Sequence, residues 1–209
     1  MAIPAVRFPY QYRPVAGTAS VVIVFAWIAV VASAVYAVGS WNWARWMVSG
    51  PPDLSDSDGP GWFAAVLGLL FCRVAWFVMA IGFFVWFRRV QWNARLVVGQ
   101  EWGRRRKALS MTEVWNASDP VQRSRAEADR PKNPAFAVWV LGYVVLQLAN
   151  ASVGYLDRQS TEETAMEFTA YPAAVHLVIA VVFAVVTTLS VRAITRRQTT
   201  PAFFGWPRV

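Results

Sequence analysis

The stretch that decides the fold is AGTASVVIVFAWIAVVASAVYAVG, residues 16–39, which contains no charged side chain. Three comparable apolar runs follow, at residues 61–87, 134–155 and 171–191. A helix of about 20 apolar residues crosses the hydrocarbon layer of a bilayer, where backbone polar groups have to pair within their own segment. We therefore predict an all-α integral membrane protein, a single domain over residues 1–209 that forms a bundle of four transmembrane helices.

The amino-acid composition favours the same class. Hydrophobic residues make up 56% of the chain and charged residues only 15%, whereas about 25% of the residues in soluble domains are charged. The first run is longer than the 7–15 apolar residues of a secretory signal, so we predict that it is retained. A single cysteine, Cys72, excludes an intrachain disulfide and a metal site built from several cysteines.

Charge alternates between the segments that connect the apolar runs. Residues 88–133 include eleven basic and five acidic side chains, and both ends of the chain are basic as well. The two other connections carry acidic clusters, Asp53, Asp56 and Asp58 in the first and Asp157, Glu162, Glu163 and Glu167 in the last. Because Lys and Arg are enriched in cytoplasmic loops, we predict that both termini and residues 88–133 are cytoplasmic.

Basic side chains in this cytoplasmic segment are predicted to contact anionic lipid or a partner protein: Arg88, Arg89, Arg104, Arg105, Arg106 and Lys107. A Lys or Arg beside a membrane attracts anionic lipid by about 1 kcal/mol. The net charge of +8 is therefore explained by membrane contact, and we predict no nucleic-acid binding. Apolar residues among the arginines predict that the second helix continues past Arg89 and then bends along the membrane interface. Ser110-Met111-Thr112-Glu113 fits a capping box that starts a short new helix.

Arg73 is the only side chain in the four runs that is charged at neutral pH whatever its surroundings. An arginine at the bilayer centre costs about 2.5–3.5 kcal/mol on insertion scales, so we expect it to face the bundle, a partner chain or a wet cavity. Gln147 is the polar residue nearest to its depth, and this intramembrane polar site is interpreted either as a structural hydrogen-bond hub or as a site for an anion or lipid headgroup. His176 is expected near the outer interface, hydrogen-bonded or hydrated, and Cys72 as a small buried side chain.

Two segments carry a resemblance to a known family. Residues 84–94 read FVWFRRVQWNA and residues 113–120 read EVWNASDP. Apolar helices before an arginine-rich, Asn-Ala-containing exit, followed by a Trp-x-Ala-Ser-Asp-Pro turn, resemble an uncharacterised actinobacterial membrane-protein family, the domain of unknown function numbered four-three-two-eight. The resemblance covers about Arg13 to Pro120. It implies the plasma membrane of a bacterium and no particular activity.

No arrangement of residues in the sequence indicates catalysis, cofactor binding or a metal centre. The chain has one histidine and one cysteine, and the apolar runs contain no carboxylate. We therefore predict a protein that is not an enzyme and uses no cofactor, an accessory or scaffold subunit of a larger membrane assembly. Its expected partners are anionic lipids and other membrane-protein subunits or further copies of itself. The alternative is a small oligomeric channel or transporter that uses Arg73.

Overall fold

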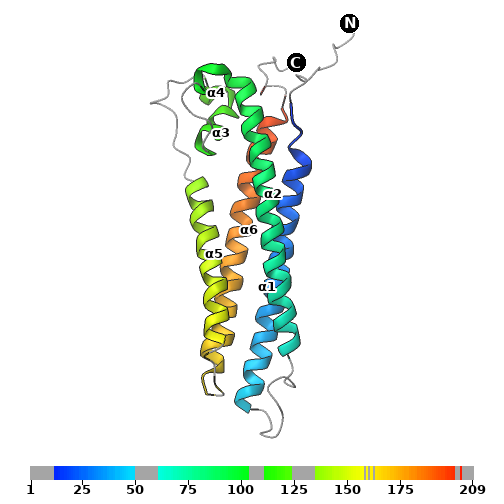
Figure 1. Ribbon diagram of the computed structural model, residues 1–209, viewed down its shortest axis with the longest axis vertical. Coiled ribbons are helices and arrows are strands. Elements are labelled where there is room, and N and C mark those ends of the chain that lie inside the picture. Colours follow the sequence, from blue (N-terminus) through cyan, green and yellow to red (C-terminus); the bar gives the residue numbers. More distant parts are fainter. Residues whose placement is uncertain are drawn as a thin grey trace. The chain divides into compact units, whose positions relative to one another are not determined.

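A computed structural model gives the fold of the chain (Figure 1). It describes residues 12–49, 61–103, 111–123, 135–157, 159, 161, 163–200 and 203. Within these residues the chain forms helices and turns and no strand, which confirms the predicted all-α class. The helices in chain order are α1 (Ala16–Ser49), α2 (Trp62–Gly103), α3 (Met111–Ala117), α4 (Pro120–Arg123), α5 (Ala135–Asp157), the π-helix η3 (Met166–Ala170) and α6 (Tyr171–Gln198).

Three helical stretches are long and apolar enough to cross a membrane. They are α1, the part Trp62–Val97 of α2, and η3 together with α6 over Met166–Gln198. These stretches fit the predicted membrane class. The described apolar part of α5, Trp139–Ser152, is shorter. A fourth crossing therefore stays a prediction, although the whole of α5 has 23 residues and about 20 are sufficient.

The second helix continues beyond its apolar run, as the sequence predicted. α2 passes Arg89 without a break and ends at Gly103. The next helix, α3, begins at Met111 and matches the short helix expected from the capping box. The expected cap residue, Ser110, lies outside the described residues.

The first helix also continues, beyond Gly39 to Ser49, and this extension was not predicted. Ala44 in the extension is fully buried against Ala165, which directly precedes η3, and Ala170, the last residue of η3. Packing against this later part of the chain stabilises helical turns that the apolar run alone did not require.

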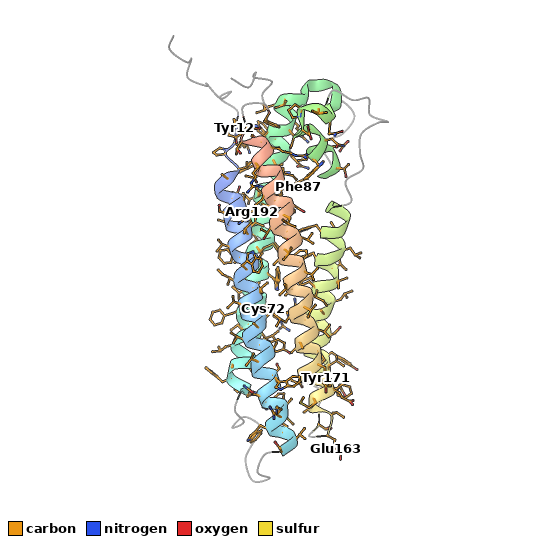
Figure 2. The ribbon with its side chains drawn as sticks, turned by 180° about the vertical axis from the view of Figure 1, so that it is seen from behind. Tyr12, Cys72, Phe87, Glu163, Tyr171 and Arg192 are labelled. Atoms are coloured by element: carbon orange, nitrogen blue, oxygen red, sulfur yellow. The ribbon has the colours of Figure 1, made fainter. Side chains whose placement is uncertain are left out.

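Contacts divide the chain into two compact units. Unit 1 comprises Met1–Val21, Ile81–Phe136 and Ser190–Val209, and unit 2 comprises Val22–Ala80 and Ala137–Leu189. Within unit 2, stretches of α1, α2, α5 and α6 run side by side (Figure 1). Tyr171 and Glu163 lie near one end of this unit (Figure 2).

In unit 2, α1 and α2 approach so closely that their backbones touch. A Cβ atom added to Gly68 would lie 2.5 Å from the backbone nitrogen of Tyr36 and 3.0 Å from the carbonyl oxygen of Ala32. A Cβ atom at Gly39 would likewise collide with the backbone of Ala65. Helices in a bilayer gain little from apolar burial against each other and associate through small residues instead. We refer to this contact as the glycine seam.

In the same unit, two neighbouring threonines of α6 receive hydrogen bonds from two other helices. The indole N–H of Trp139 in α5 donates to Thr187 at 3.1 Å, and that of Trp27 in α1 donates to Thr188 at 3.2 Å. An indole N–H buried without a partner would cost free energy. These two bonds therefore allow large amphipathic rings to fill the space between the helices.

Phe183 of α6 fills the contact between α2, α5 and α6 in unit 2. Its ring centroid lies 5.4 Å from that of Trp76, 5.6 Å from Trp139 and 6.1 Å from Tyr143. Gly142 leaves room for it, since a Cβ atom there would lie 2.9 Å from the Phe183 ring. The interior at this level is therefore occupied by packed aromatic rings.

Most buried positions of α1 in unit 2 carry small side chains. The small buried side chains are Ala26, Ala29, Ala32, Ser33 and Ala44, beside the larger Val22 and Tyr36, whereas Val24, Ile28, Val31, Val35 and Val38 are exposed. A water-soluble core would show the opposite arrangement. In lipid, large apolar side chains can face outward without cost, and small ones allow helices to approach.

Candidate functional site

Unit 1 contains a buried polar junction that is centred on Asn93 of α2. The Asn93 side chain is fully buried and pairs with the backbone of Arg13 in both directions. Its Oδ1 accepts from the Arg13 N–H at 3.0 Å, and its Nδ2 donates to the Arg13 carbonyl at 2.9 Å. Arg13 lies just before α1, where the backbone has no regular helical partners. Asn93 supplies those partners and holds the start of α1 against α2.

Gln198, the last residue of α6, extends the polar junction. Its Nε2 donates to the carbonyl of Val90 and to Oγ of Ser118, both at 3.1 Å, and its Oε1 accepts from Nδ2 of Asn93 at 3.4 Å. Ser118 follows α3 and donates in turn to the carbonyl of Val114 at 2.7 Å. One buried amide therefore links α2, α6 and the turn after α3.

Two arginines lie over tryptophan rings beside the polar junction. The guanidinium carbon of Arg13 is 4.3 Å from the ring centroid of Trp92, and that of Arg197 is 4.1 Å from Trp115. Such rings attract a cation to their faces. Arg197 also lies 3.5 Å from the carboxylate of Asp119, a partly exposed ion pair that contributes little by itself. The stacks fix positive groups at defined places on unit 1.

The predicted lipid or partner contacts fall partly within the described residues. Arg88 is exposed on α2, and its guanidinium carbon is 5.8 Å from the ring centroid of Phe84. Arg89 donates to the carbonyl of Pro14 at 2.9 Å, so it also ties the start of α1 to α2. The remaining predicted contacts lie outside the described residues: Arg104, Arg105, Arg106 and Lys107.

Sequence reasoning did not assign the polar junction, although the chain contains a signal for it. The tripeptide Trp-Asn-Ala occurs twice, at residues 92–94 and 115–117. In both copies the asparagine and the alanine are buried, and an arginine lies over the tryptophan. The repeat marks two helix positions that place an amide inside unit 1 and an aromatic ring at its edge.

Arg73 and Gln147, the predicted intramembrane polar site, both lie on outward faces of unit 2. Their side chains are exposed, and no hydrogen bond or ion pair joins either of them to a described residue. Cys72, the residue before Arg73 (Figure 2), is instead fully buried, with its Sγ 3.2 Å from Oγ of Ser33 in α1. The structure thus buries Cys72, as predicted, and does not bring Arg73 and Gln147 together.

His176 differs from the prediction that it would be hydrogen-bonded or hydrated. Its side chain is 1% exposed, and neither ring nitrogen has a hydrogen-bond partner among the described residues. The ring packs edge-on against Tyr36, with centroids 6.3 Å apart. Since Trp139 of α5 is level with Thr187 of α6, their antiparallel register puts Asn150 level with His176. Asn150 is buried as well, and its Oδ1 has no described partner.

The described residues contain no group of three or more His, Cys, Asp or Glu side chains that could hold a metal ion. The polar junction consists mainly of neutral amides and a hydroxyl, which position helices, and the two arginine–tryptophan stacks beside it present positive charge. Comparison with protein-family models, curated proteins and solved structures gives no match.

Proposed function

We propose that the protein is a non-catalytic accessory or scaffold subunit of a larger membrane assembly in a bacterial plasma membrane. In this proposal α5 forms a fourth crossing, and both termini and residues 88–133 are cytoplasmic, because basic segments alternate with acidic ones along the chain. The location in the plasma membrane of a bacterium, specifically an actinobacterium, follows from the family resemblance. The basic cytoplasmic segment contacts anionic lipid.

The outward position of Arg73 is the observation that carries this proposal. Its exposed side chain lies in the apolar part of α2 and has no described ion-pair partner. Buried charge is expected to line a pathway in a channel formed by one chain. Here the interior of unit 2 is filled by rings such as Phe183 and Trp76. A charge on the outside of the helices favours a role in assembly with other chains.

The polar junction of unit 1 supports the lipid contact in this proposal. Asn93 and Gln198 join the start of α1, the later part of α2 and the end of α6. Arg88 and Arg89 belong to the same unit and lie at or near its surface. Because these helix ends are held together, the positive charges act on the membrane surface as one cluster.

Purification in mild detergent tests the accessory function. We expect the protein to copurify with another membrane protein at a fixed ratio, and we expect the isolated chain in proteoliposomes to pass no more potassium or chloride than empty liposomes do. The alternative, an oligomeric channel, predicts that the isolated wild-type chain conducts and that Arg73→Leu does not. Conduction of this kind would replace the accessory proposal.

Replacing Arg104, Arg105, Arg106 and Lys107 by glutamine tests the lipid contact. At about 1 kcal/mol per basic residue, we expect the preference for phosphatidylglycerol over phosphatidylcholine to fall at least tenfold, measured with spin-labelled lipids in proteoliposomes. The wild-type preference should also fall with salt, because the Debye length decreases from about 10 Å at 0.1 M to about 3 Å at 1 M. Arg45→Gln, in the α1 extension, is the control and should retain the preference. A preference that is independent of salt would argue against this contact.

A further inference from the structure

Arg73 belongs to a stripe of exposed side chains on the α2 part of unit 2. The stripe consists of Phe63, Val66, Leu70, Arg73 and Phe77, which are separated alternately by three and four residues. Its four apolar members are between 45% and 67% exposed, and Arg73 is exposed as well. This spacing places the five side chains along one face of α2, and the same spacing forms the seam where two helices pack. We refer to these five residues as the α2 stripe.

In the proposed membrane topology, the position of Arg73 along α2 places its charge far from water. At about 1.5 Å per residue, Arg73 lies roughly 17 Å along the helix from Trp62, about half of the 30 Å hydrocarbon layer. A guanidinium carries five N–H donors and stays protonated. Since none of them reaches a described acceptor, the α2 stripe is incomplete without an anionic group from outside the chain.

We propose that the α2 stripe docks a transmembrane helix of a different protein, and that this helix carries an aspartate or glutamate level with Arg73. The inference rests on the proposed accessory function and names the chemistry of its partner. The apolar members of the α2 stripe provide the packing surface. Arg73 provides the selectivity, because a carboxylate accepts two parallel hydrogen bonds from a guanidinium and neutralises its charge.

Charge decides between this occupant and a second copy of the chain. The four apolar runs contain no aspartate or glutamate, so a second copy docked along the α2 stripe would leave Arg73 without a carboxylate. A symmetric contact would also place two guanidinium groups close together in lipid, where like charges repel strongly. The partner helix therefore comes from another protein.

Depth decides between a partner helix and a lipid headgroup. Phosphate groups lie outside the hydrocarbon layer, whereas Arg73 lies near its middle. Acyl chains would cover the apolar side chains of the α2 stripe but offer no acceptor to Arg73, whereas a docked helix can provide both packing and a carboxylate. A carboxylate on a docked helix meets both features of the α2 stripe.

Synthetic single-span helices test the proposal with the full-length protein in proteoliposomes. Three probes of leucine and alanine differ only at the central residue, which is Glu, Gln or Lys, and association is measured by energy transfer between dyes on the chain ends. We expect wild-type protein to bind the Glu probe at least tenfold more tightly than the Gln probe. Arg73→Lys should retain much of this preference, Arg73→Gln should lose it, and Arg73→Glu should prefer the Lys probe. Arg45→Leu, an exposed arginine of the α1 extension, is the matched control and should behave as the wild type does.

Three results would overturn the proposal. The first is equal binding of the Glu and Gln probes to wild-type protein. The second is a Glu preference that persists in Arg73→Gln when circular dichroism and gel filtration show that this variant is folded. The third is an Arg73-dependent immobilisation of spin-labelled phosphatidylglycerol without a Glu preference, which would assign the α2 stripe to lipid.

The experiment separates failure of this inference from failure of the proposed function. In one outcome, a native partner copurifies with the Arg73→Gln variant as it does with the wild-type protein, and the probes show no Glu preference. The accessory function then stands, and the α2 stripe is not its docking surface. If the probes show the Arg73-dependent preference but no partner copurifies from the native membrane, the inferred chemistry of the stripe stands and the accessory function fails.

Discussion

Gly68→Ala is expected to lower the free energy of unfolding by about 3 kcal/mol, the upper part of the range for overpacking. The added Cβ atom would lie 2.5 Å from the backbone nitrogen and 2.7 Å from the Cα atom of Tyr36. Because these are backbone atoms, rotation of a side chain does not relieve the overlap, and α1 and α2 have to separate along the glycine seam. The measurement is reversible unfolding by sodium dodecyl sulfate in mixed micelles, followed by circular dichroism.

Two other glycines provide matched controls. A Cβ atom at Gly17 of α1 meets no atom within 4 Å, so Gly17→Ala should be neutral or should stabilise the helix by up to about 1 kcal/mol. At Gly142 the nearest atom belongs to the ring of Phe183, which can shift, so Gly142→Ala should have an intermediate effect. Equal stabilities of Gly68→Ala and Gly17→Ala would contradict the close approach of α1 and α2.

Asn93→Leu is expected to increase hydrogen exchange at the Arg13 amide by about 30-fold, which corresponds to about 2 kcal/mol. Leucine has a similar size but neither accepts from the Arg13 N–H nor donates to the Arg13 carbonyl. Both groups then lose partners that lie 3.0 and 2.9 Å away in the wild type. Exchange measured by mass spectrometry on peptides that contain Arg13 tests this effect.

Gln198→Leu is the control for the Asn93 variant. It removes the hydrogen bonds to Val90 and Ser118 and the 3.4 Å bond from Asn93, but leaves both bonds between Asn93 and Arg13 in place. We therefore expect protection of the Arg13 amide to stay within about threefold of the wild type, with unfolding easier by about 1–2 kcal/mol. If Asn93→Leu leaves exchange at Arg13 unchanged, the Asn93 side chain does not hold the start of α1.

Several features of the fold could be predicted from the sequence because they depend on local chemistry. A stretch as apolar as residues 16–39 is helical in lipid whatever surrounds it, since its backbone has no other way to form hydrogen bonds. The continuation of α2 past Arg89 and the start of α3 at Met111 also followed from neighbouring residues. The burial of Cys72 agreed with its small apolar side chain.

The direction in which each polar side chain points was not predictable in the same way. A helix that is apolar on all sides has no polar stripe to mark its outer face, so the sequence leaves open whether Arg73 faces the bundle, a partner chain or a wet cavity. The extension of α1 to Ser49 and the burial of His176 both depend on contacts with residues more than 100 positions away. The spacing of small residues on α1 was the available signal, since Ala26, Ala29 and Ser33 are buried.

The sequence by itself determined the all-helical class, three stretches that are long and apolar enough to cross a membrane, and where the positive charge is concentrated. These properties follow from composition within a window of about 20 residues. The tertiary structure decided that Asn93 and Gln198 form the polar junction, that Gly68 lies against a backbone, and that Arg73 faces outward. These properties depend on how one helix is rotated against the next, which is set by close packing between segments far apart in the sequence.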